Sequence, residues 1–536
     1  MAGATLKETI LSELLLQRLE RPAGTQAERN GTHMNRQLYE LIRQEILAGS
    51  ISAGSKLPAS RLLATEIGVS RNTVLYAYEQ LLAEGYVTAS TGRGTFVSQT
   101  FPDHSALHKA GARIGTTSVP AVQQNSNRFD LSRRGMHLVS NAGASDRQWG
   151  AFMAGVPDVS LFPHATWARL LNKHWRNPRP ELLTYAHHGG YMPLRRVLAE
   201  HLRLARAVRC EPEQIILTTG IHQAIDLIAR LLADPGDKAW MEDPGYWGTR
   251  SLLTNAGVDV IPVPVDEEGI APDAARLQDP PRFIFATPSH QYPLGTVMSL
   301  TRRRMLLEYA RQRGAWIVED DYDSEFRFEG RPLASLQGLD EHDRVIYMGT
   351  FSKTLFPGLR MGFMVLPKPL APHFATGLSE LFREGQLMQQ AVLADFIEEG
   401  HYATHLRRMR QRYAQRQGLL REAIAKRFGQ DWPTSTHEAG LHLVMHLPPG
   451  ADDLGISMAA RTQGLSARPL SRYYSDEQRA RQGLLLGYAC VPEDDIGPAF
   501  HKLAEVIEPA LEHLARTRQP PREFSARINN EAWSGA

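Results

Sequence analysis

The sequence predicts an α/β protein with two domains, a small helical head and a larger body around a mainly parallel sheet. A chain of 536 residues is too long for a single hydrophobic core. Residues 99–128 are rich in Ser, Thr, Gly, Ala, Gln and Asn without a sustained apolar period, which is typical of a linker. Beyond residue 128, short apolar runs alternate with longer helical segments, which is the pattern of an α/β domain.

Domain boundaries follow from these changes of pattern. We expect an N-terminal extension at residues 1–33, a head at 34–98, the linker at 99–128, a body at 129–516 and a loose tail at 517–536. In the body, the strand-like runs are Ile215–Leu217, Val258–Val263, Phe283–Phe285, Trp316–Val318, Val345–Met348 and Phe363–Leu366. The helical segments between them include Gln223–Leu232 and Arg302–Arg313.

The composition is that of an ordinary soluble protein. The chain is 42% hydrophobic and 22% charged with a net charge of +2, which points to no acidic or basic partner. Cys210 and Cys490 are the only cysteines, so we expect neither a disulfide framework nor a metal site. Polar residues interrupt Ile10–Leu19, which favours a short amphipathic helix, and no apolar run approaches the roughly 20 residues that span a bilayer. Without a secretory signal either, the protein is expected in the cytoplasm, away from membranes.

Residues 34–98 have the periodicity of three short helices followed by a hairpin. The first helix is expected at Arg36–Leu47, and the second at Arg61–Ile67 with Ser60 as its cap and with Leu62, Leu63 and Ile67 facing inward. Gly68 supplies the turn, and Ser70 caps a third helix whose buried face is Val74, Leu75, Tyr78 and Leu81. This order predicts a helix-turn-helix.

The third helix and the hairpin carry groups suited to DNA. If the third helix is the recognition helix, its first residues have the short polar or guanidinium groups that reach phosphates and base edges. Tyr86–Val97 consists of two β-prone runs, and Arg93 at its tip is able to enter a minor groove. Six Lys or Arg against five acidic residues give little electrostatic guidance, so a small interaction module remains an alternative.

The run LPASRLLATEIGVSRNTVLYAYEQLLAEGYVTASTGRGTFV resembles the winged-helix head of GntR-type bacterial regulators across nearly its whole length. The resemblance implies binding to a double-stranded DNA operator. It implies DNA contacts at Arg61, Ser70, Arg71, Asn72, Thr73, Arg93 and Gly94.

Lys353 stands directly after an apolar run, in the segment MGTFSKTLFPGLRMGF. A single lysine is normally a solvated surface charge, but a desolvated lysine beside other cations has the lowered pKa that imine formation requires. Thr350 and Ser352 offer hydroxyls, and Arg360 a planar fork, to a phosphate. The segment is therefore able to hold both ends of pyridoxal 5′-phosphate (PLP).

The run WIVEDDYDSEF puts carboxylates at the C-terminal end of a strand, where ligands of open α/β sheets bind. PLP needs an acid near its pyridine nitrogen, because the protonated ring is the better electron sink. We favour Asp320 for the pyridine nitrogen and Tyr322 for the 3′ oxygen. The cluster is also of a kind that binds a metal or caps a helix.

Two further segments follow strands upstream of this run. In LTTGIHQAIDL a glycine turn leads into a helix, whose free N–H groups at Ile221 and His222 form an anion site. In EDPGYW, Tyr246 is able to stack on the pyridine ring, although a core aromatic residue after a turn explains it equally well.

Together, GGYMPLR, TTGIHQA, EDPGY, TPSHQYPLG, EDDYDSEF and TFSKTLFPGLRMG resemble the ordered motifs of fold-type I PLP aminotransferases, over roughly Asp146 to Ala515. Joined to the GntR-type head, they identify the chain as a member of the MocR/GabR subfamily of bacterial regulators. The resemblance implies PLP as cofactor and a homodimer in which Tyr185 lies near the neighbouring subunit's phosphate site.

Two departures from the aminotransferase pattern concern the ligand. The arginine that usually binds the substrate carboxylate is expected on the strand GLLLGY, where Leu484 and Leu485 stand instead, and Arg472 is the nearest alternative effector-binding residue. The usual Asn-Pro-x-Gly turn is also replaced, which leaves Gln291 or Tyr292 to approach the 3′ oxygen. Efficient transamination is therefore not expected.

The leading hypothesis is a PLP-dependent transcription factor in which an amino compound, or PLP itself, changes the imine at Lys353 and biases how two heads sit on DNA. The alternatives are a working aminotransferase with an accessory head and a binding module in which Lys353 is inert.

Overall fold

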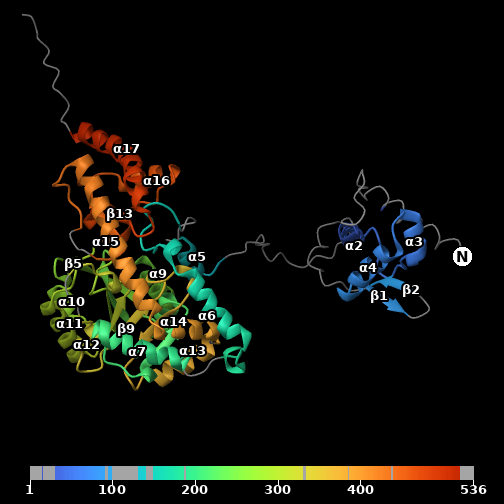
Figure 1. Cartoon of the computed structure of the whole chain (residues 1–536), viewed down its shortest axis with the longest axis horizontal. Coiled ribbons are helices and arrows are strands. Elements are labelled where there is room, and N and C mark those ends of the chain that lie inside the picture. The colour runs from blue at the N-terminus through green and yellow to red at the C-terminus, as the bar shows by residue number, and fades with distance from the viewer. Residues whose placement is uncertain are drawn as a thin grey trace, which may run out of the picture. The chain divides into compact units, whose positions relative to one another are not determined.

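The computed structural model describes residues 15, 31–90, 94–98, 131–140, 149–185, 189–329, 334–383, 385–435 and 439–518. The chain divides into two compact units, residues 1–128 and 129–536 (Figure 1). The predicted linker at 99–128 lies outside the described residues. So does the predicted N-terminal helix, apart from Leu15, which is helical and buried. Within the described ranges, no helix is long and apolar enough to cross a membrane.

The head contains the predicted helices and hairpin. Its elements are α2 (Gly31–Leu47), α3 (Ser60–Ile67), α4 (Arg71–Ala83), β1 (Val87–Ser90) and β2 (Gly94–Val97). Ser70 caps α4 as predicted, because its side chain accepts a hydrogen bond from the Thr73 N–H at 3.1 Å. Gly68 ends α3 in the left-handed conformation, with φ of 71°.

Two predictions about the second helix are wrong. The N-cap of α3 is Ala59, which makes no side-chain hydrogen bond, and Ser60 is the first helical residue. Leu62 is 44% exposed, because the core-facing positions that lie three and four residues before Ile67 are Ala64 and Leu63. On α4, Ala77 joins the buried face while Leu75 is only partly buried.

The body is built around an eight-stranded sheet with the order β3-β10-β9-β8-β7-β4-β5-β6. The strands are β3 (Ile215–Thr218), β4 (Lys238–Asp243), β5 (Asp259–Asp266), β6 (Gly269–Ile270), β7 (Phe283–Ala286), β8 (Trp316–Asp321), β9 (Val345–Thr350) and β10 (Gly362–Val365). Strands β5, β4, β7, β8 and β9 are parallel, whereas β10 runs antiparallel to both neighbours and β6 antiparallel to β5. The mainly parallel α/β class is therefore confirmed.

Helices bury the central strands on both faces. On β8, for example, Ile317 belongs to the core cluster that includes Leu306, and Val318 to a different cluster that includes Ile228. Strands covered on both faces read as continuous apolar runs, which is why the sequence identified them. The helices of this part are α5 (Arg133–Ser140), α6 (His164–Arg176), α7 (Met192–Arg206), α8 (Ile221–Leu232), α9 (Trp247–Ala256), α10 (Ala274–Gln278), α11 (Leu300–Arg313), α12 (Leu336–Leu339), α13 (Ala371–Phe382) and α14 (Leu387–Glu398).

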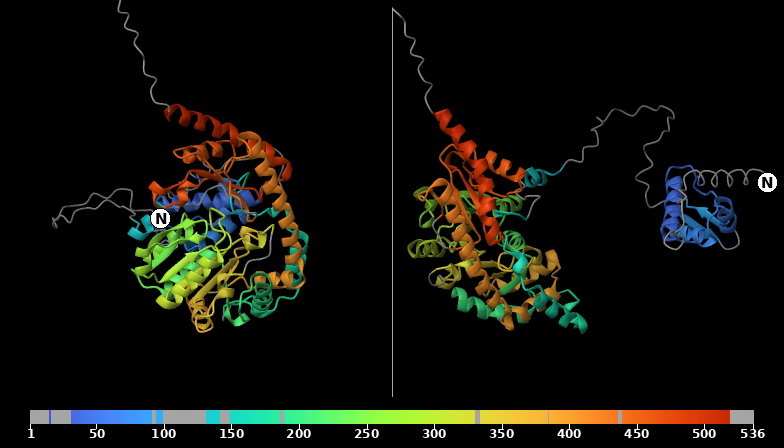
Figure 2. Two further views of the ribbon diagram at one scale, coloured as in Figure 1. Left: turned by 90° about the vertical axis from the view of Figure 1, so that its left-hand side faces the viewer. Right: turned by 45° about the horizontal axis from the view of Figure 1, so that its top comes forward.

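A smaller C-terminal part carries a second sheet. The long helix α15 (His401–Phe428) runs along one side of the body toward it (Figure 2). Its antiparallel strands have the order β11 (His442–His446), β13 (Gly483–Gly487) and β12 (Arg468–Pro469). Helices α16 (Asp453–Thr462) and α17 (Glu493–Arg518) complete it. Because α17 continues to Arg518, the predicted start of the tail at residue 517 lies two residues too early.

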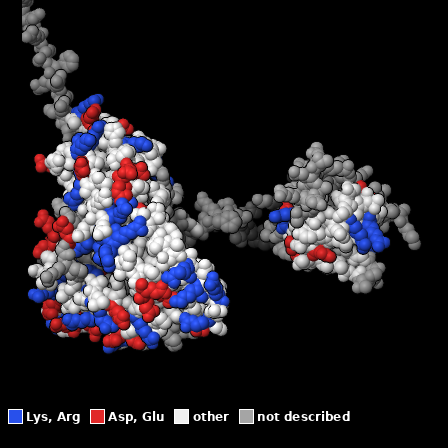
Figure 3. Space-filling view, viewed as in Figure 1, with Lys and Arg blue, Asp and Glu red and all other residues white. Residues whose placement is uncertain are grey.

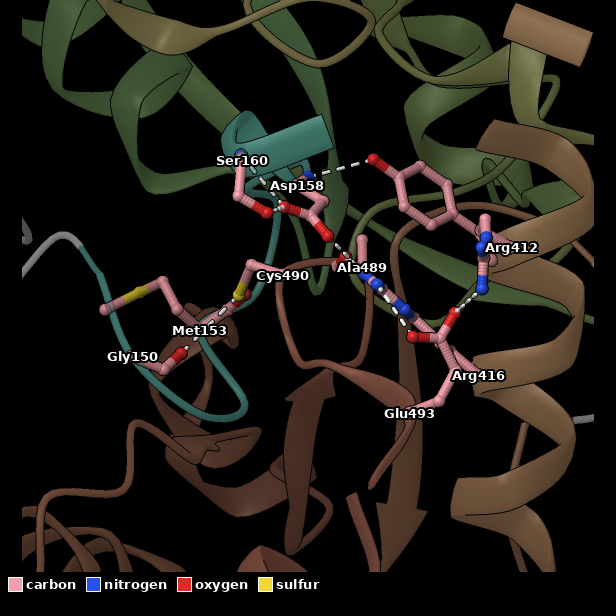
Figure 4. Close-up of polar contacts among 10 residues, drawn as sticks. Gly150, Met153, Asp158, Ser160, Arg412, Arg416, Ala489, Cys490 and Glu493 are labelled. Atoms are coloured by element: carbon pink, nitrogen blue, oxygen red, sulfur yellow. Dashed lines mark hydrogen bonds and ion pairs between the residues drawn. The ribbon is translucent and has the colours of Figure 1, made fainter. Parts of the chain in front are cut away.

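A buried ion pair fixes the first described segment of the body after α5 (Figure 4). Arg416 on α15 donates to Asp158 at 2.9 Å, to the carbonyl of Ala489, and to Glu493 at 3.2 Å. The Asp158 N–H donates to the hydroxyl of Tyr413 at 2.9 Å. Residues 149–161 are thereby tied to α15 and to the loop after β13.

We predict that Arg416→Met lowers the free energy of unfolding of the body by about 3–5 kcal/mol, because it leaves the Asp158 carboxylate buried without its cation. Urea denaturation followed by circular dichroism measures this. The matched control is Arg427→Met, since Arg427 pairs with Glu508 at the surface. Equal losses in the two variants would contradict the prediction.

Candidate cofactor site and DNA-binding face

Lys353 lies in the loop that follows β9, and its side chain is partly buried. Its Nζ donates to the carbonyl of Gly155 at 2.7 Å. Burial lowers the pKa of Lys353 to about 8, with Arg468 and Arg360 adding to the shift while Asp323 and Asp320 oppose it. The neutral, nucleophilic form of this amine is therefore far more populated near physiological pH than that of an ordinary lysine.

Asp320 stands at the end of β8 with an unsatisfied oxygen. Its Oδ1 is buried and has no hydrogen-bond partner. Burial, reinforced by the neighbouring Asp321, raises the pKa of Asp320 to about 7. An orphaned buried acceptor is costly and calls for a donor from a ligand, and the protonated nitrogen of a pyridine ring is such a donor. The carboxylate thus fits the predicted cofactor.

Tyr322 is held by a buried histidine. Its hydroxyl lies 2.9 Å from Nδ1 of His290, which is also 3.1 Å from a carboxylate oxygen of Asp323. The carboxylate of Asp323 can only accept a hydrogen bond, so we place a proton on Nδ1 of His290, which donates it to Asp323. Burial raises the pKa of Tyr322 well above its usual value, so its own proton remains available to a ligand oxygen.

The predicted phosphate ligands surround the start of α8. Gly220, with φ of 116°, precedes the helix, and no side chain caps it. The guanidinium of Arg360 lies 3.2 Å from the position that a β-carbon on Gly220 would occupy, so a larger residue would crowd it. Thr350 is buried, and its Oγ1 accepts from the Ser352 N–H at 3.2 Å. Backbone N–H groups of Ile221 and His222, two hydroxyls and a guanidinium are donors of the kind that suits a phosphate.

Tyr246 is fixed by the same helix. Its hydroxyl lies 2.9 Å from Nε2 of His222, and burial raises its pKa to about 12. Tyr246 is the N-cap residue of α9, and the centroid of its ring lies 5.9 Å from that of the Tyr292 ring. The hydrogen bond between Tyr246 and His222 thus ties the start of α9 to α8.

Three further residues singled out in the sequence differ in exposure and in hydrogen bonding. Arg472, the predicted effector ligand, is exposed in a turn after β12. Tyr185 is 71% exposed. The side-chain amide of Gln291 already has hydrogen-bond partners in the protein. It donates to the carbonyl of Pro244 at 2.9 Å and accepts from the Leu294 N–H at 3.0 Å. Of the two residues left to approach the 3′ oxygen, only Tyr292 joins the aromatic group of the site.

Sequence reasoning missed Arg468, Tyr473 and Gly155. Arg468 and Tyr473 belong to the segment around β12, a strand of two residues that shows no period of its own. The hydroxyl of Tyr473 is 3.0 Å from that of Tyr292. Gly155 contributes only a backbone carbonyl, which no side-chain pattern reveals.

On the head, the predicted DNA contacts divide into exposed and buried residues. Arg61, Ser70, Arg71 and Asn72 are exposed at or near the starts of α3 and α4. Thr73 is buried, and its Oγ1 pairs with the Ser70 hydroxyl at 2.9 Å, so its role is in the cap. Gly94 opens β2 with φ of 113°, and a β-carbon there would meet the Lys56 side chain at 2.7 Å. Arg93 lies outside the described residues.

Comparison with known proteins identifies both units. Residues 158–503 match the aminotransferase class I and II family, and residues 34–97 match the bacterial regulatory proteins of the gntR family. The probable rhizopine catabolism regulatory protein MocR of Rhizobium meliloti is 44% identical over 85% of this chain and 90% of its own length. The chain belongs to the MocR/GabR subfamily of GntR-type regulators.

Other relatives of this MocR/GabR-type chain cover the same two units or the body alone. The pyridoxine biosynthesis transcriptional regulator PdxR of Corynebacterium glutamicum is 30% identical over 89% of this chain and 96% of its own length. The crystal structure of LysN, an α-aminoadipate aminotransferase of Thermus thermophilus complexed with N-(5′-phosphopyridoxyl)-L-leucine, matches with a TM-score of 0.63. Its identity is 27% over 70% of this chain and 97% of that structure. The predicted combination of a winged-helix head with a fold-type I body is confirmed.

We predict that Lys353 of the PLP-free protein reacts with a small amine-acylating reagent with a midpoint at about pH 8, because burial favours its neutral form. Mass spectrometry of the peptide that contains Lys353 measures the labelled fraction at each pH. In the urea-unfolded chain the midpoint should rise toward the ordinary lysine value of 10.5. A folded midpoint equal to the unfolded one would show that the amine is not desolvated.

Proposed function

We propose that this protein is a PLP-dependent, DNA-binding transcriptional regulator whose body senses an amino compound, or PLP itself, through Lys353. One observation carries the proposal. The chain joins a winged helix that has an exposed polar helix start to a body in which a buried amine is coupled to a carboxylate with an unsatisfied oxygen.

Bound PLP supplies an aldehyde to which an amine can attach covalently. Lys353 would provide such an amine in the resting protein, and Asp320 would hold the proton on the ring nitrogen. Tyr322 would donate to the 3′ oxygen, and Tyr246 would pack against the ring. The start of α8 together with Thr350, Ser352 and Arg360 would hold the phosphate.

We further propose a homodimer that acts on an operator in the cytoplasm. Trp175, Leu183 and Tyr185 are each more than half exposed within a short stretch of the body, which supports a protein partner there. A second subunit would cover the exposed side chain of Tyr185. On the visible face of the body, acidic and basic side chains are interspersed (Figure 3), so we assign DNA binding to the head.

The set of Lys353, Asp320 and Tyr322 also favours a second candidate function, slow transamination. We rank it below regulation because the relatives that share both units carry the names of regulators. Steady turnover of amino donors with a keto acid by the full-length protein would establish it.

We predict that Lys353→Ala abolishes the visible absorbance band of the purified protein, because no other described lysine is identified at the site. Exposed Lys502 provides the matched control, since Lys502→Ala should keep the band. A band that survives in Lys353→Ala would rule out this lysine as the attachment point.

We predict that Arg71→Ala weakens binding to DNA fragments selected by the wild-type protein by at least about tenfold, because a guanidinium contact to a base or phosphate contributes ~1–3 kcal/mol. Electrophoretic mobility shifts at several salt concentrations measure this, and loss of a phosphate contact would also reduce the salt dependence. Arg36→Ala on α2 removes the same charge outside the recognition helix and should have little effect. Equal losses in both variants would point to net charge rather than to α4.

A further inference from the structure

Tyr76 is an exposed aromatic residue on α4, the second helix of the helix-turn-helix. Its side chain is 41% exposed, and its hydroxyl forms no hydrogen bond with any residue that the structure describes. Tyr78, on the same helix, is only 8% exposed, and its hydroxyl donates to the carbonyl of Pro58 at 2.9 Å. Tyr78 therefore stabilises the fold of the head, whereas Tyr76 presents an aromatic ring to the surroundings.

The outward face of α4 lies opposite the face that packs against α2 and α3. The buried residues of the helix are Thr73, Val74, Ala77, Tyr78 and Leu81. At about 3.6 residues per turn, the opposite face carries Asn72, Tyr76 and Glu79, all of them exposed. Asn72 and Tyr76 are four residues apart, so they lie side by side on this face, ~6 Å apart along the helix axis.

The charges along α4 indicate which end of the helix suits DNA. Arg71 is its first residue, and the free N–H groups at the same end carry a positive partial charge. Glu79 is exposed two turns later, where its carboxylate would be repelled by phosphates. Tyr76 is the last exposed residue before Glu79. The surface from Arg71 to Tyr76 therefore matches the end of a recognition helix that enters a groove.

The ring of Tyr76 is suited to the methyl group of thymine. In the major groove this methyl group distinguishes thymine from the other bases, and apolar side-chain surface reads it. The amide of Asn72 matches the N6 and N7 edge of adenine. Because stacked bases are about 3.4 Å apart, the two side chains reach bases within about two steps of each other. A polar and an aromatic side chain on one face can thus read neighbouring base pairs.

We propose that Tyr76 is a specificity-determining residue of the head, whose ring contacts the methyl group of a thymine in the major groove of the operator. The inference rests on the proposed function, because it requires that the head binds DNA. It goes beyond that function by naming the base and the chemical group that this side chain reads.

The test uses the full-length protein and the duplexes that the wild type selects from a random pool. Each thymine of the selected site is replaced in turn by deoxyuridine, which removes only the methyl group and keeps the base pairing. At the thymine that Tyr76 contacts, the replacement should weaken binding about fourfold, equivalent to ~0.8 kcal/mol for one buried methyl group. Fluorescence anisotropy at constant salt measures the dissociation constants.

The variants show whether the lost methyl group and the ring form one contact. Tyr76→Ala should bind the unmodified duplex at least about tenfold more weakly, since burial of an aromatic ring contributes more than one methyl group. The same deoxyuridine should then have no further effect, because both changes remove the same contact. Tyr76→Gln should behave in the same way, and it decides the matter if Tyr76→Ala does not fold. Tyr76→Phe should retain the effect of deoxyuridine, because the ring rather than the hydroxyl meets the methyl group.

Leu82→Ala is the matched control, because Leu82 is 44% exposed near the other end of α4. It should keep both the wild-type affinity and the effect of deoxyuridine. A wild type that is insensitive to deoxyuridine at every thymine would overturn the inference, and so would a sensitivity that persists in Tyr76→Ala. Undiminished binding by Tyr76→Ala would overturn it as well and, joined to a loss of self-association, would assign the ring to an interface between two copies.

Failure of the proposed function gives a different result. If the wild type selects no duplex at all, the DNA-binding proposal is wrong, and the role of Tyr76 in reading thymine is overturned with it. If the wild type selects a site but shows no methyl effect that depends on Tyr76, DNA binding stands and only the assignment of Tyr76 is wrong.

Discussion

The buried ion pair between Arg416 and Asp158 is the constraint on which the site depends (Figure 4). Both side chains are at most 4% exposed, so neither charge has water as a substitute partner. Their pairing fixes the segment that contains Met153 and Gly155 against α15. Because Gly155 accepts the hydrogen bond of Lys353 and Met153 contacts Arg468, a structural charge pair positions the groups that meet the ligand.

Burial of the site brings the pKa values of a base, Lys353, and an acid, Asp320, close together. Desolvation disfavours every charged form, so it lowers the pKa of Lys353 to about 8 and raises that of Asp320 to about 7. In water these two values would be separated by more than six units. A ligand that offers a carbonyl carbon to the amine and a protonated nitrogen to the carboxylate satisfies both groups at once.

The elements and residues that sequence reasoning identified are those with a local cause. Runs such as Val345–Met348 are apolar because both faces of the sheet are covered, and Ser70 is a cap because the N–H of Thr73 lies within its reach. Arg468 was not identified from the sequence because its position depends on the pairing of β12 with β13, where it lies opposite Leu485. The sequence of neither strand indicates which other strand it pairs with. Arg472 was chosen instead because sequence distance cannot tell which of two arginines in one loop faces inward. Leu62 was misplaced because an eight-residue helix allows more than one apolar stripe.

The order of segments along the chain limits how a ligand signal can reach the head. For the signal to be allosteric, the ligand must bind two arrangements of the heads with different affinity. A hundredfold preference, equivalent to about 2.7 kcal/mol, would be available from one hydrogen bond between a ligand and a charged group. The segment with Met153 and Gly155 is also the part of the site that follows α5 and the linker most directly in sequence. A ligand that contacts this segment therefore acts on the stretch of the body with the shortest covalent path to the DNA-binding unit, a stretch that the Arg416–Asp158 pair ties to α15.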